Sequence, residues 1–110
     1  MTSDLSKKEC KQCDGGTPPL KGDALKQMQN RLNGGWKILD EQRLEKEFKF
    51  PDFSHALKFV NRVGDLAEKQ NHHPDIYFTW GKARIQIWTH SAKGLTETDF
   101  ILAAKIDELD

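Results

Sequence analysis

The chain has 110 residues, with 17 basic and 17 acidic side chains that give a formal net charge of zero at pH 7. This length fits one domain with a modest core, and the lack of a basic excess argues against a nucleic-acid-binding protein. No apolar run is long enough to span a membrane, and the first residues lack the apolar core of a signal peptide, so we expect a cytoplasmic protein.

Residues 1–21 are predicted to form an extended N-terminal arm, because two consecutive prolines near its end favour extended backbone. Residues 22–110 are predicted to form one domain. The arm contains Cys10 and Cys13, whose spacing is typical of redox pairs and of half a zinc site. A redox pair normally lies at the start of a helix, but this pair is followed by turn-forming residues. A zinc site would need further ligands, and the chain has no second cysteine pair. We therefore favour a reduced pair in an ordinary arm over redox or metal use.

The first half of the domain is predicted to contain one short helix and two strands. Leu25, Met28 and Leu32 recur at helical spacing and predict a helix over 23–32, which ends at the following glycines. Strands are favoured between 36 and 50, with a charged turn near 40–43. Good helix formers in this stretch make a helix the alternative, but the clean alternation of apolar and charged residues from position 45 onward favours strands.

The second half begins with the clearest helix, over 53–70, whose apolar residues recur at three- and four-residue steps and whose start Asp52 or Ser54 can cap. Two strands follow, over 76–80 and 84–90, joined by a turn at Gly81-Lys82. A capping-box pattern over 96–99 then opens a final helix. Its predicted buried face consists of Phe100, Leu102 or Ala103, Ile106 and Leu109.

The predicted order is helix, strand, strand, helix, strand, strand, helix, which is typical of an α+β domain. We expect a four-stranded antiparallel sheet with the helices packed on one face. An uncovered sheet edge in so small a domain favours pairing with a second copy of the chain, so a homo-oligomer is expected.

Three of the four histidines are predicted to lie close together. His72 and His73 stand where the helix over 53–70 gives way to a strand, a kind of junction that often carries reactive side chains. In a hairpin centred near Lys82, residue 90 would pair near residues 74–75, which brings His90 to the same corner. Because imidazole both donates and accepts protons near neutral pH, the three rings predict an acid–base site.

Other interpretations stay open at this point. A histidine at a helix C-terminus interacts favourably with the helix dipole, and a strand histidine is often a half-exposed surface residue. Three imidazoles also suggest zinc, but adjacent His72 and His73 are poorly placed to face one ion, so proton transfer is preferred to metal binding. His55 is expected on the solvent side of its helix. Trp80 and Trp88 suit either the walls of a flat ligand site or a core or interface.

A larger set of residues resembles the signature of the pterin-4a-carbinolamine dehydratases. Five residues separate the His-His-Pro motif from Trp80, nine separate Trp80 from His90, and eight separate His90 from Asp99. The resemblance extends to residues 15–20, which precede the domain, to Gly35-Trp36 and to residues 53–60. It therefore covers nearly the whole chain. The signature residues are Glu68, His72, His73, Pro74, Trp80, His90 and Asp99.

The resemblance implies a hydro-lyase that dehydrates 4a-hydroxytetrahydrobiopterin, or a related 4a-hydroxytetrahydropterin, to the quinonoid dihydropterin. It implies a place in tetrahydrobiopterin recycling after aromatic amino acid hydroxylation, with no metal and no cofactor, because the pterin is itself the substrate. It also implies a homodimer or homotetramer. The alternative function is a protein-binding module of the same fold, a dimerisation cofactor or transcription coactivator, without direct contact to nucleic acid.

The resemblance also implies roles for individual residues. His72, His73 and His90 are the implied catalytic residues, with His72 and His90 favoured for proton transfer and His73 for binding or assistance. Glu68, one helical turn before His72, is expected to orient that ring or to bind the pterin, although a solvated helix acid is the alternative. Pro74 and Trp80 are the other expected substrate-binding residues. Asp99 belongs to the signature, but its capping role explains it without catalysis.

Overall fold

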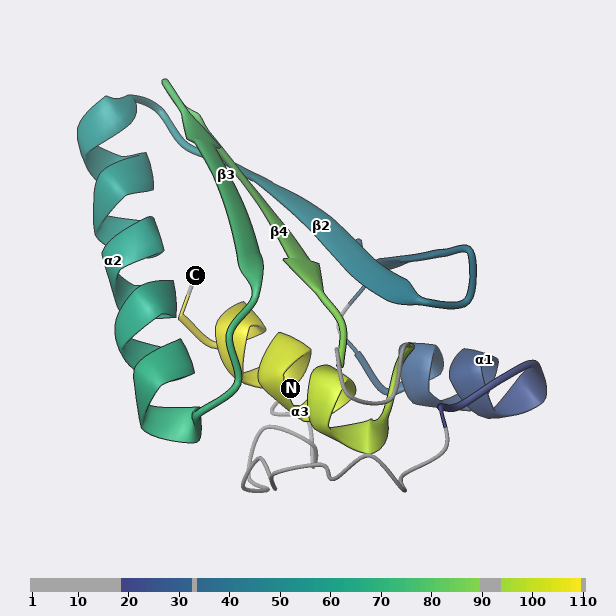
Figure 1. Cartoon of the computed structure of the whole chain (residues 1–110). Helices are drawn as coiled ribbons and strands as arrows, with labels where there is room; N and C mark the ends of the chain where they lie inside the picture. Colours follow the sequence, from purple (N-terminus) through teal and green to yellow (C-terminus); the bar gives the residue numbers. More distant parts are fainter. Residues whose placement is uncertain (1–18, 33, 90–93, 110) are drawn as a thin grey trace.

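The computed structural model of the chain describes residues 19–32, 34–89 and 94–109. Cys10, Cys13, His90 and nearly all of the predicted arm lie outside the described residues, so predictions about them stay predictions. The order of the elements in the described chain confirms the predicted α+β class (Figure 1). The elements are α1 (Asp23–Asn30), β1 (Lys37–Leu39), β2 (Arg43–Lys49), α2 (Phe53–Gln70), β3 (Asp75–Thr79), β4 (Lys82–Ile87) and α3 (Glu97–Asp107).

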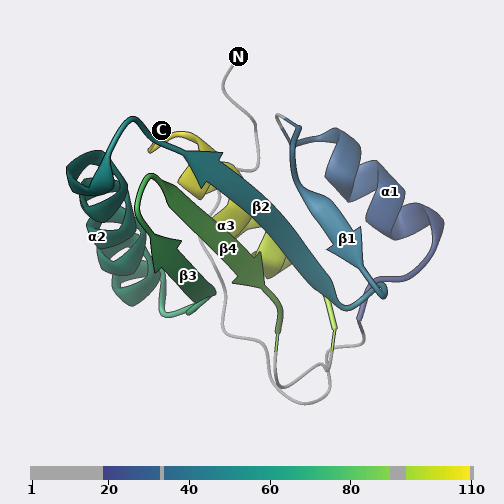
Figure 2. The same cartoon turned by 90° about the horizontal axis from the view of Figure 1, so that it is seen from above.

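The four strands form one antiparallel sheet in the order β1-β2-β4-β3, so β1 and β3 are its edges. In Figures 1 and 2, α2 and α3 lie on the same side of this sheet, with α1 near the β1 edge. The helices therefore cover one face, as the sequence predicts, and the opposite face carries the outward-pointing residues of the strands. No helix in the described part of the chain has the length and apolarity needed to cross a membrane.

The hairpin between β3 and β4 has a shorter loop than the predicted hairpin, whose centre was placed near Lys82. Thr79 pairs with Lys82, so only Trp80 and Gly81 form the loop, and Gly81 takes a φ of 69° that suits a two-residue turn. As a result Gln86 stands opposite Asp75, and the predicted hairpin centre near Lys82 is wrong. The same register, continued for three residues beyond that pair, brings position 89 level with position 72.

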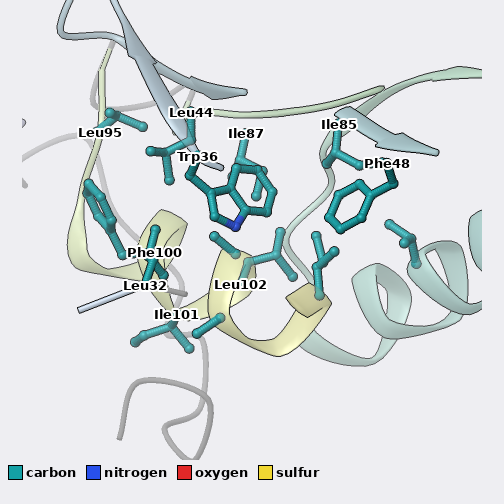
Figure 3. Packing of buried hydrophobic residues seen from close by; sticks show 14 of the residues in the cluster. Leu32, Trp36, Leu44, Phe48, Ile85, Ile87, Leu95, Phe100, Ile101 and Leu102 are labelled. Atoms are coloured by element: carbon teal, nitrogen blue, oxygen red, sulfur yellow. The ribbon is translucent and has the colours of Figure 1, made fainter. Parts of the chain in front are cut away.

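The core lies between the sheet and the helices, and α3 forms its centre (Figure 3). The sequence predicts one buried face for this helix, yet residues 98–104 and 106 of α3 are all buried. The helix contacts both α1 and α2 while it lies under the sheet, so it has almost no solvent-facing side. The sheet contributes Leu44, Phe48, Ala83, Ile85 and Ile87, and the facing side of α2 contributes Ala56, Phe59, Val63 and Ala67.

One charged pair is built into this core beside Trp36. Lys46 is on the helix-facing side of β2, and its Nζ lies 2.7 Å from Oδ1 of Asp107, whose side chain is only 3% exposed. The Trp36 indole N–H donates to the other oxygen of Asp107 at 3.0 Å. The carboxylate thus neutralises the lysine that the strand alternation turns inward, and it fastens the end of α3 to β2.

Candidate active site

The turn between α2 and β3 fixes the position of His72. Helix α2 begins at its predicted residue, where the Asp52 carboxylate accepts the His55 N–H at 2.9 Å, and this backbone hydrogen bond lowers the pKa of Asp52. The helix ends at Asn71, which takes the left-handed conformation with a φ of 53°. The next backbone N–H, that of His72, donates to the Ala67 carbonyl at 3.1 Å. His72 is therefore attached to the last turn of the helix.

The imidazole of His72 is held by a buried carboxylate from α3. Its Nε2 lies 2.7 Å from Oδ1 of Asp99. The His72 side chain is 15% exposed and that of Asp99 is fully buried. Because an ionised carboxylate only accepts hydrogen bonds, Nε2 carries the hydrogen in the neutral ring and Nδ1 is left as the proton acceptor. The pair thus has the geometry of a carboxylate-oriented acid–base histidine.

Asp99 is fixed in turn by residues on both sides of the 90–93 segment. Its Oδ2 accepts the Thr89 hydroxyl at 2.7 Å and the Thr96 backbone N–H at 2.8 Å. The second contact belongs to the predicted capping box, which the structure confirms at the start of α3. Asp99 therefore caps the helix and also holds His72, a second role that the sequence alone did not assign to it.

His73 and Glu68 form a separate, exposed pair. Nε2 of His73 lies 3.3 Å from Oε1 of Glu68, with 55% and 80% of the two side chains exposed. One of the two roles expected for Glu68 was to orient His72, but its partner in the structure is His73, whereas the His72 ring faces Asp99. The two adjacent histidines therefore differ in environment: one is enclosed and fixed, and the other faces solvent.

The other predicted site residues lie in two places. Pro74 directly follows the histidines and is half-buried at the entry to β3. Trp80 is 68% exposed in the hairpin loop at the other end of β3, about 20 Å of strand away from Pro74 at the usual rise per residue. Within one chain, the structure thus brings His72, His73, Glu68 and Pro74 together and leaves Trp80 apart from them.

Sequence reasoning did not single out Thr89 for the site. The alternation of the predicted strand places Thr89 on the same face as Ile85 and Ile87, but it does not show that the Thr89 hydroxyl reaches Asp99. In the described ranges, no group of three or more His, Cys, Asp or Glu side chains is placed to hold a metal ion. The expectation that the reaction needs neither metal nor cofactor stays a prediction.

The fold and this site define a class of small α+β proteins in which a helix-to-strand corner presents two adjacent histidines beside an acidic residue of the last helix. The family model described as pterin 4 alpha carbinolamine dehydratase matches residues 18–109. The chain belongs to the pterin-4a-carbinolamine dehydratase family.

Related sequences named as members of this family match nearly the whole chain. A protein of Rubrobacter xylanophilus named "putative pterin-4-alpha-carbinolamine dehydratase" is 55% identical over 107 residues, which are 97% of this chain and 99% of the relative. A protein of the same name from Alkaliphilus metalliredigens is 45% identical and covers 96% of each chain. These names support a dehydratase.

A solved structure has the same fold. The crystal structure of a transcriptional coactivator/pterin dehydratase from Brucella melitensis superposes with a TM-score of 0.76 at 31% identity, over 82% of this chain and 96% of that one. The helices and the four-stranded antiparallel sheet of the present chain therefore match the fold of a protein that is named a pterin dehydratase.

Proposed function

We propose that this protein dehydrates a 4a-hydroxytetrahydropterin to the quinonoid dihydropterin by histidine acid–base catalysis. The hydroxyl on carbon 4a must leave as water, which requires a proton donor. The adjacent ring nitrogen must lose its proton, which requires a base, and a double bond then forms between the two atoms. The reaction needs no net oxidation, so one proton donor and one acceptor near the pterin are sufficient.

The observation that carries this proposal is the pairing of His72 with the buried carboxylate of Asp99. A ring in a fixed orientation with a defined tautomer is what a proton-transfer group requires, since a freely rotating ring would have to be ordered in each catalytic cycle. A merely structural histidine at a helix end needs no such partner. Family membership supplies the substrate class for this acid–base pair.

We assign the roles as follows. His72 transfers a proton through the nitrogen that Asp99 leaves free, and His90, which follows Thr89 in the chain, is the proposed second proton-transfer group. His73 and Glu68, both exposed beside His72, offer polar groups to the amino and ring nitrogens of the pterin. Pro74 is proposed to line the pterin site at the start of β3. No metal or cofactor takes part.

A direct assay tests the function. The purified chain is mixed with freshly generated 4a-hydroxytetrahydrobiopterin, and formation of the quinonoid product is followed by absorbance against the uncatalysed reaction. We expect the protein to accelerate dehydration well above background. A folded chain, verified by circular dichroism, that leaves the background rate unchanged would show that the proposed function is wrong.

We also propose that the chain forms a homo-oligomer through α2 and the β3 edge. Among the described residues, the exposed large apolar side chains are Phe53, Leu57, Tyr77 and Trp80, and all lie on α2 or on β3 with its loop. An unpaired edge strand beside such side chains favours association with a second copy. We also propose that association with a second copy at this edge brings Trp80 close to a pterin site.

Size-exclusion chromatography with light scattering tests the assembly. We expect the wild type to elute as a dimer or tetramer and Leu57→Glu to shift toward the monomer, because the new charge would be buried without a partner. Lys37→Glu, an exposed change on the opposite edge strand, is the matched control and should leave the mass unchanged. A monomeric wild type would contradict the proposal.

The cellular role follows from the proposed reaction. We propose that the protein acts in the cytoplasm and dehydrates the 4a-hydroxytetrahydropterin that an aromatic amino acid hydroxylase leaves, so that a separate two-electron reduction of the quinonoid dihydropterin can regenerate the tetrahydropterin. The Brucella melitensis protein is named a transcriptional coactivator as well as a pterin dehydratase. Dehydration is preferred for the present chain because a protein-binding role gives no reason for the carboxylate-held His72.

A further inference from the structure

The carboxylate that orients His72 has its own orientation set from the opposite side. Asp99 points Oδ1 at the imidazole, and its Oδ2 accepts the Thr89 hydroxyl and the Thr96 N–H. Rotation of the carboxylate about its terminal bond would break all of these contacts together. The donors at Oδ2 therefore determine where Oδ1 lies, and so where the His72 ring is held.

Thr89 is the side-chain donor in this arrangement. The Thr96 contribution to Oδ2 is a backbone N–H, which almost any residue at position 96 would supply. The two threonine hydroxyls also lie 3.1 Å apart. Since the hydrogen of the Thr89 hydroxyl is used on Asp99, the Thr96 hydroxyl is the donor in that contact. All three residues are buried, so water is a poor replacement for a lost hydroxyl here.

The backbone of Thr89, directly before His90 in the sequence, also makes two hydrogen bonds to Gly94. Its backbone N–H donates to the Gly94 carbonyl at 2.9 Å, and its carbonyl accepts the Gly94 N–H at 3.4 Å. This pair closes the base of the 90–93 segment. One residue thus joins, through its side chain, the carboxylate that holds His72 and, through its backbone, the base of the segment that begins with His90.

We propose that Thr89 is a positioning residue for the dehydration, and that it acts by holding Asp99, and through Asp99 the His72 ring, in the orientation for proton transfer. It does not touch the pterin. The inference rests on the proposed function, because positioning matters to catalysis only if His72 transfers a proton. Its structural part, the link from Thr89 to the His72 ring, is measurable without substrate.

The experiment compares three variants of the full chain. Thr89→Val keeps the shape of the side chain and removes the hydroxyl, whereas Thr89→Ser keeps the hydroxyl. Ile87→Val is the matched control, because Ile87 is a fully buried residue two positions earlier, has no part in the Asp99 network, and loses only a methylene. The melting temperature of each variant is recorded, so that a general loss of stability is separated from a loss of positioning.

Two measurements are made on each variant. In the dehydratase assay we expect Thr89→Val to lower kcat about tenfold or more with KM changed less than about twofold, and Thr89→Ser to stay within about threefold of wild type. By nitrogen–proton NMR of the free protein, we expect the His72 Nε2–H signal, assigned by its loss in His72→Gln, to shift and to exchange faster with water in Thr89→Val alone.

Each outcome decides the inference. An unchanged His72 signal in Thr89→Val, a kcat loss of equal size in Ile87→Val, or a failure of serine to restore the rate would overturn it. If the wild type shows no dehydratase activity while the His72 signal responds to Thr89→Val, the proposed function is the part that fails. The link between Thr89 and the His72 ring would then stand without its catalytic consequence.

Discussion

Asp99→Asn is expected to lower kcat for dehydration by about ten-thousandfold while the chain still folds, in keeping with the loss that follows when the carboxylate beside a catalytic histidine becomes an amide. The asparagine oxygen would take the Oδ2 position, because the Thr89 hydroxyl and the Thr96 N–H both need an acceptor there. Its NH₂ group would then face His72. The ring would have to present Nε2 as an acceptor and carry its hydrogen on Nδ1, which is the wrong tautomer for the proposed proton transfer.

Asp107→Asn is the matched control for this change. Asp107 is also a buried carboxylate of α3, but it binds Lys46 and Trp36 rather than a histidine. We expect Asp107→Asn to lower stability and to leave kcat near the wild-type value. NMR of the His72 ring would show whether the tautomer has changed in Asp99→Asn. A variant that keeps the Nε2–H tautomer and full activity would contradict the assigned role of Asp99.

His72→Ala is expected to lower kcat about a hundredfold or more, because general acid–base groups typically contribute that much to the rate. The sequence predicts the same loss for His90→Ala. Removal of the His72 ring also leaves the buried Asp99 carboxylate without one of its donors, so a loss of stability of about 1–3 kcal/mol is expected alongside. The rate must therefore be measured at a temperature where the variant is fully folded.

His55→Ala separates a site effect from a general histidine effect. His55 is an exposed residue near the start of α2 that pairs with Asp52, at the opposite end of the helix from His72. We expect its replacement to leave kcat unchanged. Thermal melts by circular dichroism would establish the folded range for each variant. If His72→Ala and His55→Ala had the same rate, His72 would have no role in proton transfer.

The sequence predicted the elements of the fold closely because local rules set them. The three- and four-residue spacing of apolar side chains gave α2 over 53–70 with its Asp52 cap, and the alternation after position 45 gave β2 in a stretch that is rich in helix formers. The capping box placed the start of α3. Each of these signals depends on residues within a few positions of one another, so no knowledge of distant contacts was needed.

The hairpin register could not be obtained in the same way. Gly81-Lys82 indicated a turn, but a shift of its centre by one or two residues changes every cross-strand pair, and alternation is compatible with several registers. The burial of α3 on nearly all sides was likewise beyond the sequence. Whether a helix has a solvent face depends on how many neighbours surround it, and α1, α2 and the sheet come from distant parts of the chain.

The sequence by itself determined which residue types the site would use, because the spacing of His72, His73 and the residues after them carries the family resemblance. Only the tertiary structure decided how they differ. It joined His72 to Asp99 and Thr89, left His73 with the exposed Glu68, and placed Trp80 at the far end of β3. The physical reason is that a buried carboxylate selects its partners by position in space, and residues 72, 89 and 99 meet only after α3 has packed beneath the sheet.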